Sequence, residues 1–468
     1  MARGAAMVAV RREAGGVAAT AGPDPVAAYH DLLFSGGLAD ESAERLRAGQ
    51  EARSLVFGHR PLCIALRPQL MSRPRYDAAC AAALGVERAL TRLERALLGD
   101  ASLRAELDLE PEEERLALAD PGSKRSSPSI RIDGFFTDQL RFVENNAESP
   151  AGMAYSDTLT EVFEELPVVR TMRTRFRMRS LPVARRQTRS MLRAFRDWAA
   201  GRSERPAMAI VDWTGVPTLS EFEMFRERFE REGIRTVICD PAELEYRRGH
   251  LRAAGRPVNL VYRRVLTTEL LGRRDVAGPL TRAYLDGEVC VVNSFRAKLL
   301  HKKMSLALLS DDRYASLYTP DDLAAIARHV PWTRKVREGA TTHGGRRVED
   351  LTAFVLANRE RLVLKPNDEY GGKGVVLGWT VDDHEWEQSL HVALSQSYVV
   401  QEAVAVPKEP FPVAVDGVEM LDLSLDVDPY VFDGRPSGCL TRLSSSALLN
   451  VTAGAGSVVP TYVVEGPK

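Results

Sequence analysis

The spacing of apolar residues predicts that the first quarter of the chain is mainly helical. Within residues 25–118, one helix is expected to begin near Asp40, and apolar positions recur every three or four residues from Asp77 to Leu98. Residues 122–128, Gly-Ser-Lys-Arg-Ser-Ser-Pro, are rich in turn formers. They are expected to connect the helical region to the rest of the chain.

The pattern changes after this connector. Two short segments, 130–136 and 140–146, have strand character, and a helix is predicted from Ser156 to Leu166. Residues 170–205 then contain twelve arginines and only two acids. Because apolar residues recur there at helical spacing, we interpret the segment as an amphipathic helix with a solvated basic face, and a nucleic-acid patch is the alternative.

Residues 206–292 alternate between strand and helix patterns, which is typical of a small parallel sheet. The predicted strands are 207–213, 234–240, 258–264 and 288–293, and the predicted helices are 220–232, 241–251 and 267–285. The first turn, Asp-Trp-Thr-Gly-Val-Pro-Thr, has no GxGxxG pattern. A dinucleotide site is therefore not indicated.

From residue 296 onward, helical and strand patterns continue to alternate. The predicted helices are 296–310, 321–329, 348–358 and 382–394. Strands are predicted on both sides of a glycine-rich stretch within 363–379, at 397–404 and in the remaining residues. The whole pattern predicts an α/β protein with α+β parts.

The composition of the chain limits the number of domains, the kinds of partner and the compartment that we expect. At 468 residues the chain exceeds what one hydrophobic core usually supports, so two or three domains are expected. The net charge of −1 makes nucleic acid or a membrane surface an unlikely partner, and no apolar run approaches a membrane span. Five scattered cysteines without a CxxC pair predict a reducing, cytoplasmic compartment. Residues 1–24 are expected to be a disordered start, with a transit-like leader as the alternative.

Lysine is rare in this chain and concentrated in two places. Only nine of the 63 basic residues are lysines, and five of these lie at 298–303 and 365–373. A lysine ammonium is a flexible point charge suited to phosphate oxygens. We therefore expect both places to contact phosphate.

The second of these places is a candidate phosphate flap. Lys365 ends a predicted strand, and Lys373 lies among Gly371, Gly372 and Gly374 before another strand. Glycines let backbone N–H groups approach phosphate oxygens, although the pattern fits neither a Walker A loop nor a Rossmann turn. The alternative is an ordinary glycine-rich hairpin.

Other polar positions complete a candidate nucleotide site. Gln401 and Glu402 end the strand of 397–404, where they could meet an adenine amino group or a ribose hydroxyl. Lys302 or Lys303 could reach an α or β phosphate from the helix of 296–310. A buried strand with a polar end and two surface lysines are the alternatives.

The strand of 140–146 carries a candidate metal site. Glu144 and Asn146 are two apart and so share one face, and Asp133 on the neighbouring strand can converge on it. Carboxylate and amide oxygens suit Mg²⁺ bridging ATP phosphates. Arg131 could steady charge on a transferring phosphoryl group. The alternative is an Asn-rich turn with surface acids.

Taken together, these stretches resemble the circularly permuted ATP-grasp proteins, the group related to the synthetase domain of glutathionylspermidine synthase. The matching stretches lie within 131–152, 293–309, 363–375, 398–404 and 441–461, and the resemblance covers roughly 121–468. In ordinary ATP-grasp enzymes the acidic strand follows the lysines and the glycine loop. Here Glu144 precedes Lys303 by more than 150 residues, which is the order that a permutation gives.

The resemblance implies a circularly permuted ATP-grasp fold of five segments. These are a disordered start (1–24), a helical N-terminal region (25–120), a permuted ATP-grasp segment with the metal-binding strands (121–205), a small parallel-sheet pre-ATP-grasp domain (206–295), and the nucleotide-binding lid with the remaining core strands (296–468).

The resemblance also assigns roles to residues that match the family's motifs. The implied magnesium ligands are Asp133, Glu144 and Asn146. The implied ATP contacts are Lys302 or Lys303, Lys365, Gly371, Gly372, Lys373, Gly374, Gln401 and Glu402. The implied catalytic residues are Arg131, Lys365 and Arg442, with Asn450 as a further contributor on the phosphate side.

The implied activity is that of an ATP-dependent carboxylate–amine ligase. ATP and Mg²⁺ convert a carboxylate into an acyl phosphate, which an amine attacks to form an amide or peptide bond. The expected substrates are of the amino acid, peptide or polyamine class. A catalytically silent ATP-binding partner or regulator is the first alternative, and a phosphotransferase or nucleic-acid-linked enzyme using 170–205 is the second.

The sequence departs from the family's pattern in two respects. The usual Gly-Gly-Gly of the last motif is Gly-Ala-Gly at 454–456, and no amidase half with a Cys nucleophile is present, so glutathionylspermidine metabolism is not predicted. The acceptor pocket is expected between 206–292 and the nucleotide cleft, near 212–214. Arg263 and Arg264 either grip a substrate carboxylate there or lie on the surface.

Overall fold

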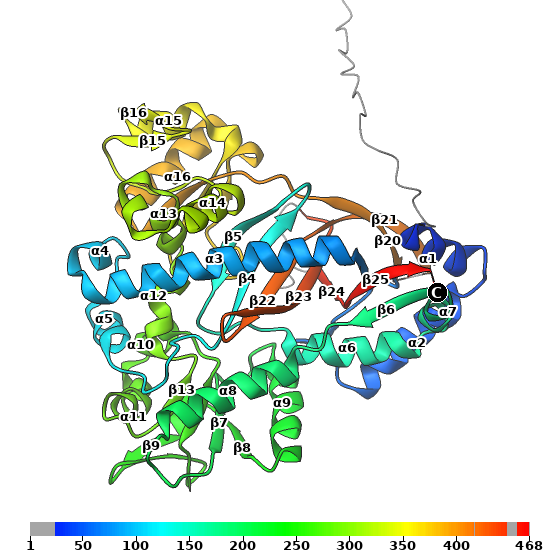
Figure 1. The fold of residues 1–468 in the computed structure, drawn as a ribbon, viewed down its shortest axis with the longest axis horizontal. Coiled ribbons are helices and arrows are strands. Elements are labelled where there is room, and N and C mark those ends of the chain that lie inside the picture. The colour runs from blue at the N-terminus through cyan, green and yellow to red at the C-terminus, as the bar shows by residue number, and fades with distance from the viewer. Residues whose placement is uncertain (1–23, 416, 447–455, 468) are drawn as a thin grey trace, which may run out of the picture.

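The computed structural model describes residues 24–467 apart from 416 and 447–455, and they form a mixed α/β fold. The expectation of a disordered start at 1–24 lies outside these residues except for residue 24, and so does the role of Asn450. Of the Gly-Ala-Gly motif, only Gly456 is described. Figure 1 shows a central sheet with two smaller parts on either side of it. Residues 333–402 form one part, here called the lid, and residues 207–292 form the other, here called the smaller domain.

The central sheet joins strands from the two halves of the chain. Its order is β20 (Lys408–Ala414), β21 (Val418–Leu425), β23 (Arg435–Ser444), β22 (Asp428–Phe432), β4 (Ser129–Phe136) and β5 (Leu140–Asn146), and β24 (Gly456–Val459) also pairs with β23. The junction is the antiparallel pair β22–β4. The strands predicted at 130–136 and 140–146 are confirmed as β4 and β5.

One long helix covers a face of the central sheet. The helix α3 (Arg73–Gly99) crosses the front of the sheet in Figure 1. Leu90 and Leu93 belong to the same buried cluster as Ile132 and Phe142 of the sheet. The apolar spacing that predicts this helix therefore marks the side that packs on the sheet.

The lid is a smaller antiparallel sheet backed by two helices. Its order is β14 (Thr333–Lys335), β19 (Tyr398–Glu402), β17 (Leu362–Pro366) and β18 (Val376–Leu377). The helices α15 (Leu351–Ala357) and α16 (Asp383–Ser395) bury Val355 and Trp386 against it. The predicted strand, glycine loop and second strand are thus present as β17, the intervening loop and β18.

The smaller domain contains the predicted parallel sheet. Its strands are β13 (Cys290–Val292), β12 (Leu260–Arg263), β7 (Ala207–Val211) and β8 (Arg235–Cys239), in that order and all parallel. The helices α9 (Leu219–Arg231), α10 (Thr267–Gly272) and α11 (Arg274–Leu285) connect them. The first and third helix predictions in this region are confirmed, the third as two consecutive helices.

The helix predicted at 241–251 is wrong. After the single turn η1 (Pro241–Glu243), the chain forms a hairpin of β9 (Leu244–Arg247) and β10 (His250–Ala253), which a short β11 (Arg256–Pro257) extends. Arg248 and Gly249 both have positive φ, as a tight hairpin turn requires. Leu244 and Leu251 pack into the domain core from alternating positions, and this burial outweighs the local helical pattern.

The single helix predicted at 296–310 is interrupted. The segment forms η2 (Phe295–Ala297), α12 (Lys298–His301) and α13 (Met304–Ser310). Lys302 has ψ of 136°, which ends the first helix, and the Lys303 backbone N–H donates to the Asn367 carbonyl. The interruption therefore lies at the two lysines of interest. The remaining helix here, α14 (Pro320–His329), agrees with prediction, and η3 (Asp312–Leu317) precedes it.

The N-terminal region is mainly helical, as predicted. It contains α1 (Pro25–Phe34), α2 (Ala39–Ala52), α3, α4 (Ala101–Ala105) and α5 (Pro111–Leu118), with a short hairpin of β1 (Val56–Phe57) and β2 (Arg60–Pro61). The strand β3 (Gln69–Ser72) joins β25 (Thr461–Pro467) and β6 (Phe176–Ser180) in a three-stranded sheet. The smaller elements are β15 (Thr341–His343), β16 (Arg346–Val348), η4 (Arg359–Arg361) and η5 (Gly378–Thr380).

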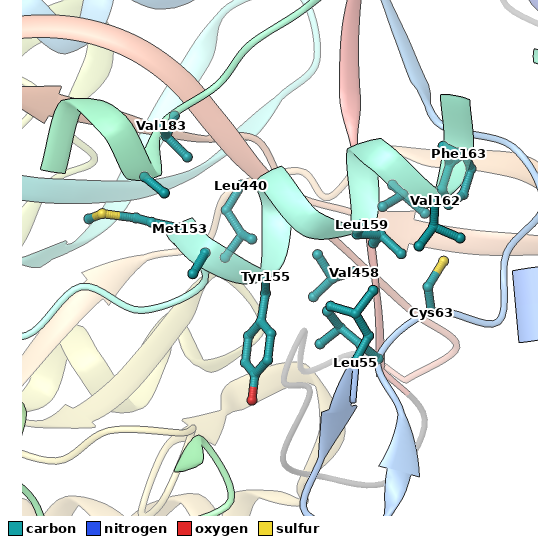
Figure 2. Packing of buried hydrophobic residues seen from close by; sticks show 14 of the residues in the cluster. Leu55, Cys63, Met153, Tyr155, Leu159, Val162, Phe163, Val183, Leu440 and Val458 are labelled. Atoms are coloured by element: carbon teal, nitrogen blue, oxygen red, sulfur yellow. The ribbon is translucent and has the colours of Figure 1, made fainter. Parts of the chain in front are cut away.

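The helix α6 (Met153–Glu165) ties this region to the central sheet. In Figure 2, Leu159 and Val162 of α6 lie beside Leu55 and Cys63, and Val458 of β24 lies close by. After α7 (Pro167–Arg175), the basic segment continues through β6 into α8 (Ala184–Trp198). Residues 170–205, which we interpret from the sequence as one amphipathic helix, are therefore divided among two helices and a strand. Within α8 the arginines are exposed while Met191, Phe195 and Trp198 are buried, as an amphipathic helix requires. None of the described helices is long and apolar enough to cross a membrane.

Candidate active site

A cleft between the central sheet and the lid brings together most of the predicted site residues. Its volume is about 1010 Å³ with the open mouth included. The predicted residues that line it are Asp133, Glu144, Lys303, Lys365, Gly371, Gly372, Gln401, Glu402 and Arg442. Apolar side chains of the lid, including Val363, Leu377 and Trp379, line it as well. The cleft thus combines a charged wall with an apolar one.

Lys365 of β17 faces this cleft. Its Nζ donates to the Gln401 Oε1 at 2.6 Å and to the Val143 carbonyl at 3.3 Å. Gln401 in turn donates from Nε2 to the Thr333 hydroxyl at 3.0 Å. Burial lowers the pKa of Lys365 to about 8, which the nearby carboxylate of Glu144 opposes. The Gln401 side chain therefore orients Lys365, in addition to lining the cleft.

Lys303, and not Lys302, lines the cleft. The Lys303 Nζ lies 3.3 Å from the Glu144 Oε1 and donates to the Glu369 carbonyl at 2.6 Å. The Lys302 Nζ points elsewhere and lies 3.0 Å from the Glu113 Oε2. The two neighbouring lysines therefore contact different parts of the molecule.

The register of β4 and β5 assembles the charged wall. Asp133 lies opposite Glu144, and Arg131 lies opposite Asn146. The Arg131 guanidinium donates to both Asp133 oxygens, at 2.7 and 2.9 Å. Burial acts to raise the pKa of Asp133, but Arg131 and Arg442 outweigh it and hold that pKa below its usual range. Asp133 is therefore ionised at neutral pH.

Two further carboxylates meet at Arg442 of β23, and sequence reasoning missed both. The Arg442 Nη2 lies 2.9 Å from Asp133, 2.7 Å from Asp426 and 3.0 Å from Asp428. Burial raises the pKa of both Asp426 and Asp428. Their sequence signal is the same as that of Glu144 and Asn146, namely two polar residues two apart where an apolar strand ends.

The carboxylates of this wall are of the chemical type that binds magnesium, although their oxygens do not all lie within 4.8 Å of one another. Asp133, Glu144 and Asp426 all line the cleft, and carboxylate oxygens are the ligands that Mg²⁺ prefers. Arg442 and Lys303 balance part of their negative charge. Asn146 lines the adjoining cavity and not this cleft. Its amide faces the same side as Glu144 along the strand.

The glycine loop approaches the cleft from the lid. Gly371, Gly372 and Gly374 all have positive φ, where a side chain would be strained. Gly371 and Gly372 line the cleft, whereas Gly374 does not. Lys373 is largely exposed and forms an ion pair with Glu369 at 2.9 Å, so it does not line the cleft either.

The base of the loop is attached to the smaller domain. The Tyr370 hydroxyl donates to the Glu269 Oε1 at 2.9 Å. Asp368 accepts from the Lys298 Nζ at 2.5 Å and from the Thr268 hydroxyl at 2.7 Å. These contacts place the loop across the boundary between the lid and the smaller domain.

A second cavity adjoins the cleft on the side of the smaller domain. It has a volume of about 1640 Å³ with its mouth included, and Asp133, Glu144, Tyr370, Gly371 and Arg442 line both spaces. Its other polar lining residues include Arg131, Asn146, Asp212, Arg264 and Glu269. The sequence predicted an acceptor pocket in this position.

Of the two adjacent arginines, only Arg264 lines this cavity. Arg263 is completely buried, and its Nη1 lies 3.0 Å from the Glu148 Oε1 and donates to the Val265 carbonyl at 2.9 Å. Neither of the two readings considered for Arg263, a substrate contact or a surface residue, describes this buried position.

Comparisons with known proteins find similarity in structure alone. No family model matches the chain, and no curated protein matches it. A glutathione synthetase-like effector (GSS30) from Globodera pallida, in its apo form, is similar with a TM-score of 0.56 and 13% identity over 90% of this chain and 96% of that chain.

Two further structures are more distant. A candidate gamma-glutamylcysteine synthetase from Methylobacillus flagellatus has a TM-score of 0.41 and 11% identity over 80% of this chain and 88% of that one. The D-cycloserine synthetase DcsG has a TM-score of 0.28 and 15% identity over 56% of this chain and 92% of that one. At these identities the comparison with the effector shows the fold alone, and the other two carry no argument. The chain therefore has a mixed α/β fold similar to that of the glutathione synthetase-like effector.

Proposed function

We propose that this protein is an ATP-dependent carboxylate–amine ligase with a circularly permuted ATP-grasp fold. The observation that carries the proposal is the cleft in which Asp133 and Glu144, from early strands, face Lys303, Lys365 and the glycine loop of the lid. The fold similarity to a glutathione synthetase-like effector supports it. The order of these segments along the chain supports the permutation.

The cleft has the features that a magnesium–ATP complex requires. Lys303 and Lys365 supply positive charge for phosphate oxygens, and the backbone of Gly371 and Gly372 allows close approach. The apolar lid residues offer a slot for the adenine base, beside Gln401 and Glu402 at the end of β19. Asp133, Glu144 and Asp426, with Asn146 next to them, would hold the magnesium ion, which neutralises charge on the phosphates.

The proposed reaction passes through an acyl phosphate. A carboxylate oxygen of the substrate attacks the γ-phosphorus, the bond to the bridging oxygen breaks, and ADP leaves. The amine nitrogen then attacks the acyl carbon, inorganic phosphate leaves, and the nitrogen loses a proton to solvent. Arg131, Lys365 and Arg442 would stabilise the charge on the transferring group, and the glycine loop would exclude water from the acyl phosphate.

The same proposal assigns the segments of the chain. Residues 121–205 and 296–468 form the permuted ATP-grasp unit, 206–295 form the pre-ATP-grasp domain, and 25–120 form a helical support. All five cysteines are free thiols, which is compatible with a cytoplasmic, reducing compartment. The substrates would be small molecules.

ADP release tests the ligase activity. The purified protein is incubated with ATP and MgCl₂ and with pools of amino acids, dipeptides or polyamines, and Glu144→Ala serves as the control. We expect at least one pool to stimulate ADP release above that of the variant. If ATP binds and no pool stimulates release, a catalytically silent ATP-binding partner or regulator is the better description. If ATP does not bind, both descriptions fail.

A further inference from the structure

The cavity beside the cleft contains two opposite charges next to each other. Asp212 directly follows β7, and Arg264 directly follows β12, and these two strands are parallel neighbours. Both residues line the cavity. In open parallel sheets, ligands bind beyond the carboxyl ends of the strands, and both residues lie at that edge.

Arg264 has unused hydrogen-bonding capacity although it is only 7% exposed. Its Nη1 donates to the Pro150 carbonyl at 2.9 Å and to the Tyr262 hydroxyl at 3.2 Å. Its Nε is buried and has no acceptor among the described residues. The carboxylate of Glu221 lies 3.9 Å from Nη2, which is too far for a hydrogen bond. The Nε of Arg264 is therefore available to donate a hydrogen bond to an acceptor on a ligand.

The carboxylate of Asp212 also has unused hydrogen-bonding capacity. Its carboxylate accepts the backbone N–H of Trp213 at 2.8 Å, and within the described part of the chain it forms no ion pair, with Arg264 or with any other cation. Glu269 also faces this end of the cavity, but its carboxylate already accepts from the Tyr370 hydroxyl and from the Leu266 N–H. Asp212 is therefore the carboxylate available to a cation.

Apolar side chains also line this cavity. Figure 2 shows Tyr155, Leu440 and Val458, which line it, lying near one another. Val216 and Pro217 line it from the loop after β7. A ligand that satisfies both charges can therefore also bury an apolar substituent.

We propose that this cavity binds a free α-amino acid with an apolar side chain, with its ammonium at Asp212 and its carboxylate at Arg264. The inference rests on the proposed function, because it takes the cavity as the substrate pocket of the ligase. A polyamine would leave the Arg264 Nε without an acceptor, and a dicarboxylate would leave Asp212 without a cation. Among the expected substrate classes, the cavity thus favours free amino acids.

Calorimetry in the absence of nucleotide tests this binding directly. The probes are L-leucine, 3-methylbutylamine, which lacks the carboxylate, and 4-methylpentanoate, which lacks the ammonium. We expect leucine to bind at least about tenfold more tightly than either analogue, because each analogue leaves one charged group unpaired. Equal affinities for leucine and either analogue, or no binding of leucine at millimolar concentrations, would overturn the proposal.

Two variants test whether leucine binds at Asp212 and Arg264. Asp212→Asn should weaken leucine binding about tenfold or more and leave 4-methylpentanoate unchanged. Arg264→Gln should weaken leucine binding and leave 3-methylbutylamine unchanged, and Asp212→Asn remains informative if the Arg264 variant does not fold. Asp157→Asn is the matched control, because burial raises the pKa of both Asp212 and Asp157 to about 6 and the Asp157 carboxylate lies outside the cavity. A loss of leucine binding in the control as large as in Asp212→Asn counts against the assignment.

Different results would overturn the proposed ligase activity and the proposed amino-acid site. ADP release stimulated by polyamines, with no binding of leucine, would overturn the amino-acid assignment and leave the ligase standing. Binding of leucine at Asp212 and Arg264, with no binding of ATP, would overturn the ligase and leave the amino-acid site standing.

Discussion

The Lys303 Nζ lies 3.3 Å from the Glu144 Oε1, which joins the segment before the lid to the central sheet across the cleft. Burial acts to raise the pKa of Glu144, but Lys303 and Lys365 together with other nearby groups outweigh it and keep that pKa below its usual range. In the absence of ligand, the two charges neutralise each other. A magnesium–ATP complex would replace this pair with a phosphate for Lys303 and a cation for Glu144.

The two adjacent lysines are therefore expected to respond differently to substitution. Lys303→Ala should weaken ATP binding about 10- to 100-fold, because it removes one charged hydrogen bond. Lys302→Ala should leave ATP affinity nearly unchanged but lower the free energy of unfolding by about 3 kcal/mol, because Lys302 is paired with buried Glu113. Titration calorimetry with ATP and urea unfolding measure the two effects. Equal losses of ATP affinity in both variants would contradict the assignment.

The pKa of Lys365, about 8, predicts a pH dependence of ATP binding. Below pH 8 the ammonium is charged and attracts phosphate, and as the pH rises through 8 the charge is lost. The dissociation constant for ATP should therefore rise above pH 8 in the wild-type protein. Lys365→Arg keeps its charge throughout this range, so its affinity should stay flat. Parallel profiles for the two proteins would rule out Lys365 as the titrating group.

The same group contributes to the pH dependence of stability with the opposite sign. Its pKa in the folded protein is lower than the ordinary value of 10.5. Between pH 8 and 10.5 the unfolded chain therefore binds more protons at this position than the folded one. The contribution of Lys365 to the free energy of unfolding should rise with pH across this window. Urea unfolding of the wild type and of Lys365→Met, compared at pH 8 and pH 10, measures it.

Arg442 is expected to be the main counter-charge of the acidic wall. Arg442→Ala leaves Asp133, Asp426 and Asp428 close together without their shared guanidinium, which should cost about 3–5 kcal/mol of stability. If these oxygens can hold Mg²⁺, MgCl₂ should raise the melting temperature of the variant more than that of the wild type. The measurement is thermal unfolding with MgCl₂ against KCl at equal ionic strength. Equal responses of the two proteins to MgCl₂ would argue against a magnesium site here.

Much of the candidate site could be predicted because its signals are local. Glu144 and Asn146 share a face because strand side chains alternate, and the glycines before β18 mark a loop between two strands. These features depend on a few neighbouring residues. The hairpin at 244–253 could not be predicted in the same way, because its strands are stabilised by burial against the domain core.

Other parts of the site depend on contacts between distant segments. Asp426 and Asp428 have the same local pattern as Glu144, yet their importance is visible only when Arg442 and Asp133 are placed beside them. Similarly, Arg263 ends β12 and Arg264 directly follows it, but the sequence does not say which of the two faces the cavity. The break between Lys302 and Lys303 depends on a backbone contact with Asn367.

The hydrogen bond from Tyr370 to Glu269 is expected to hold the glycine loop against the smaller domain. Tyr370→Phe removes this hydrogen bond, which is worth about 1 kcal/mol, so amide hydrogens of 370–375 should exchange about fivefold faster. Lys373→Ala is the matched control, since it removes an exposed ion pair within the loop and exposed pairs contribute little. Hydrogen exchange followed by mass spectrometry compares the three proteins.

Because Tyr370 lines both the cleft and the cavity, leucine should slow the exchange of this loop in the wild type more than in Tyr370→Phe. Identical exchange in all three proteins would mean that the loop is held by Asp368 and its partners instead.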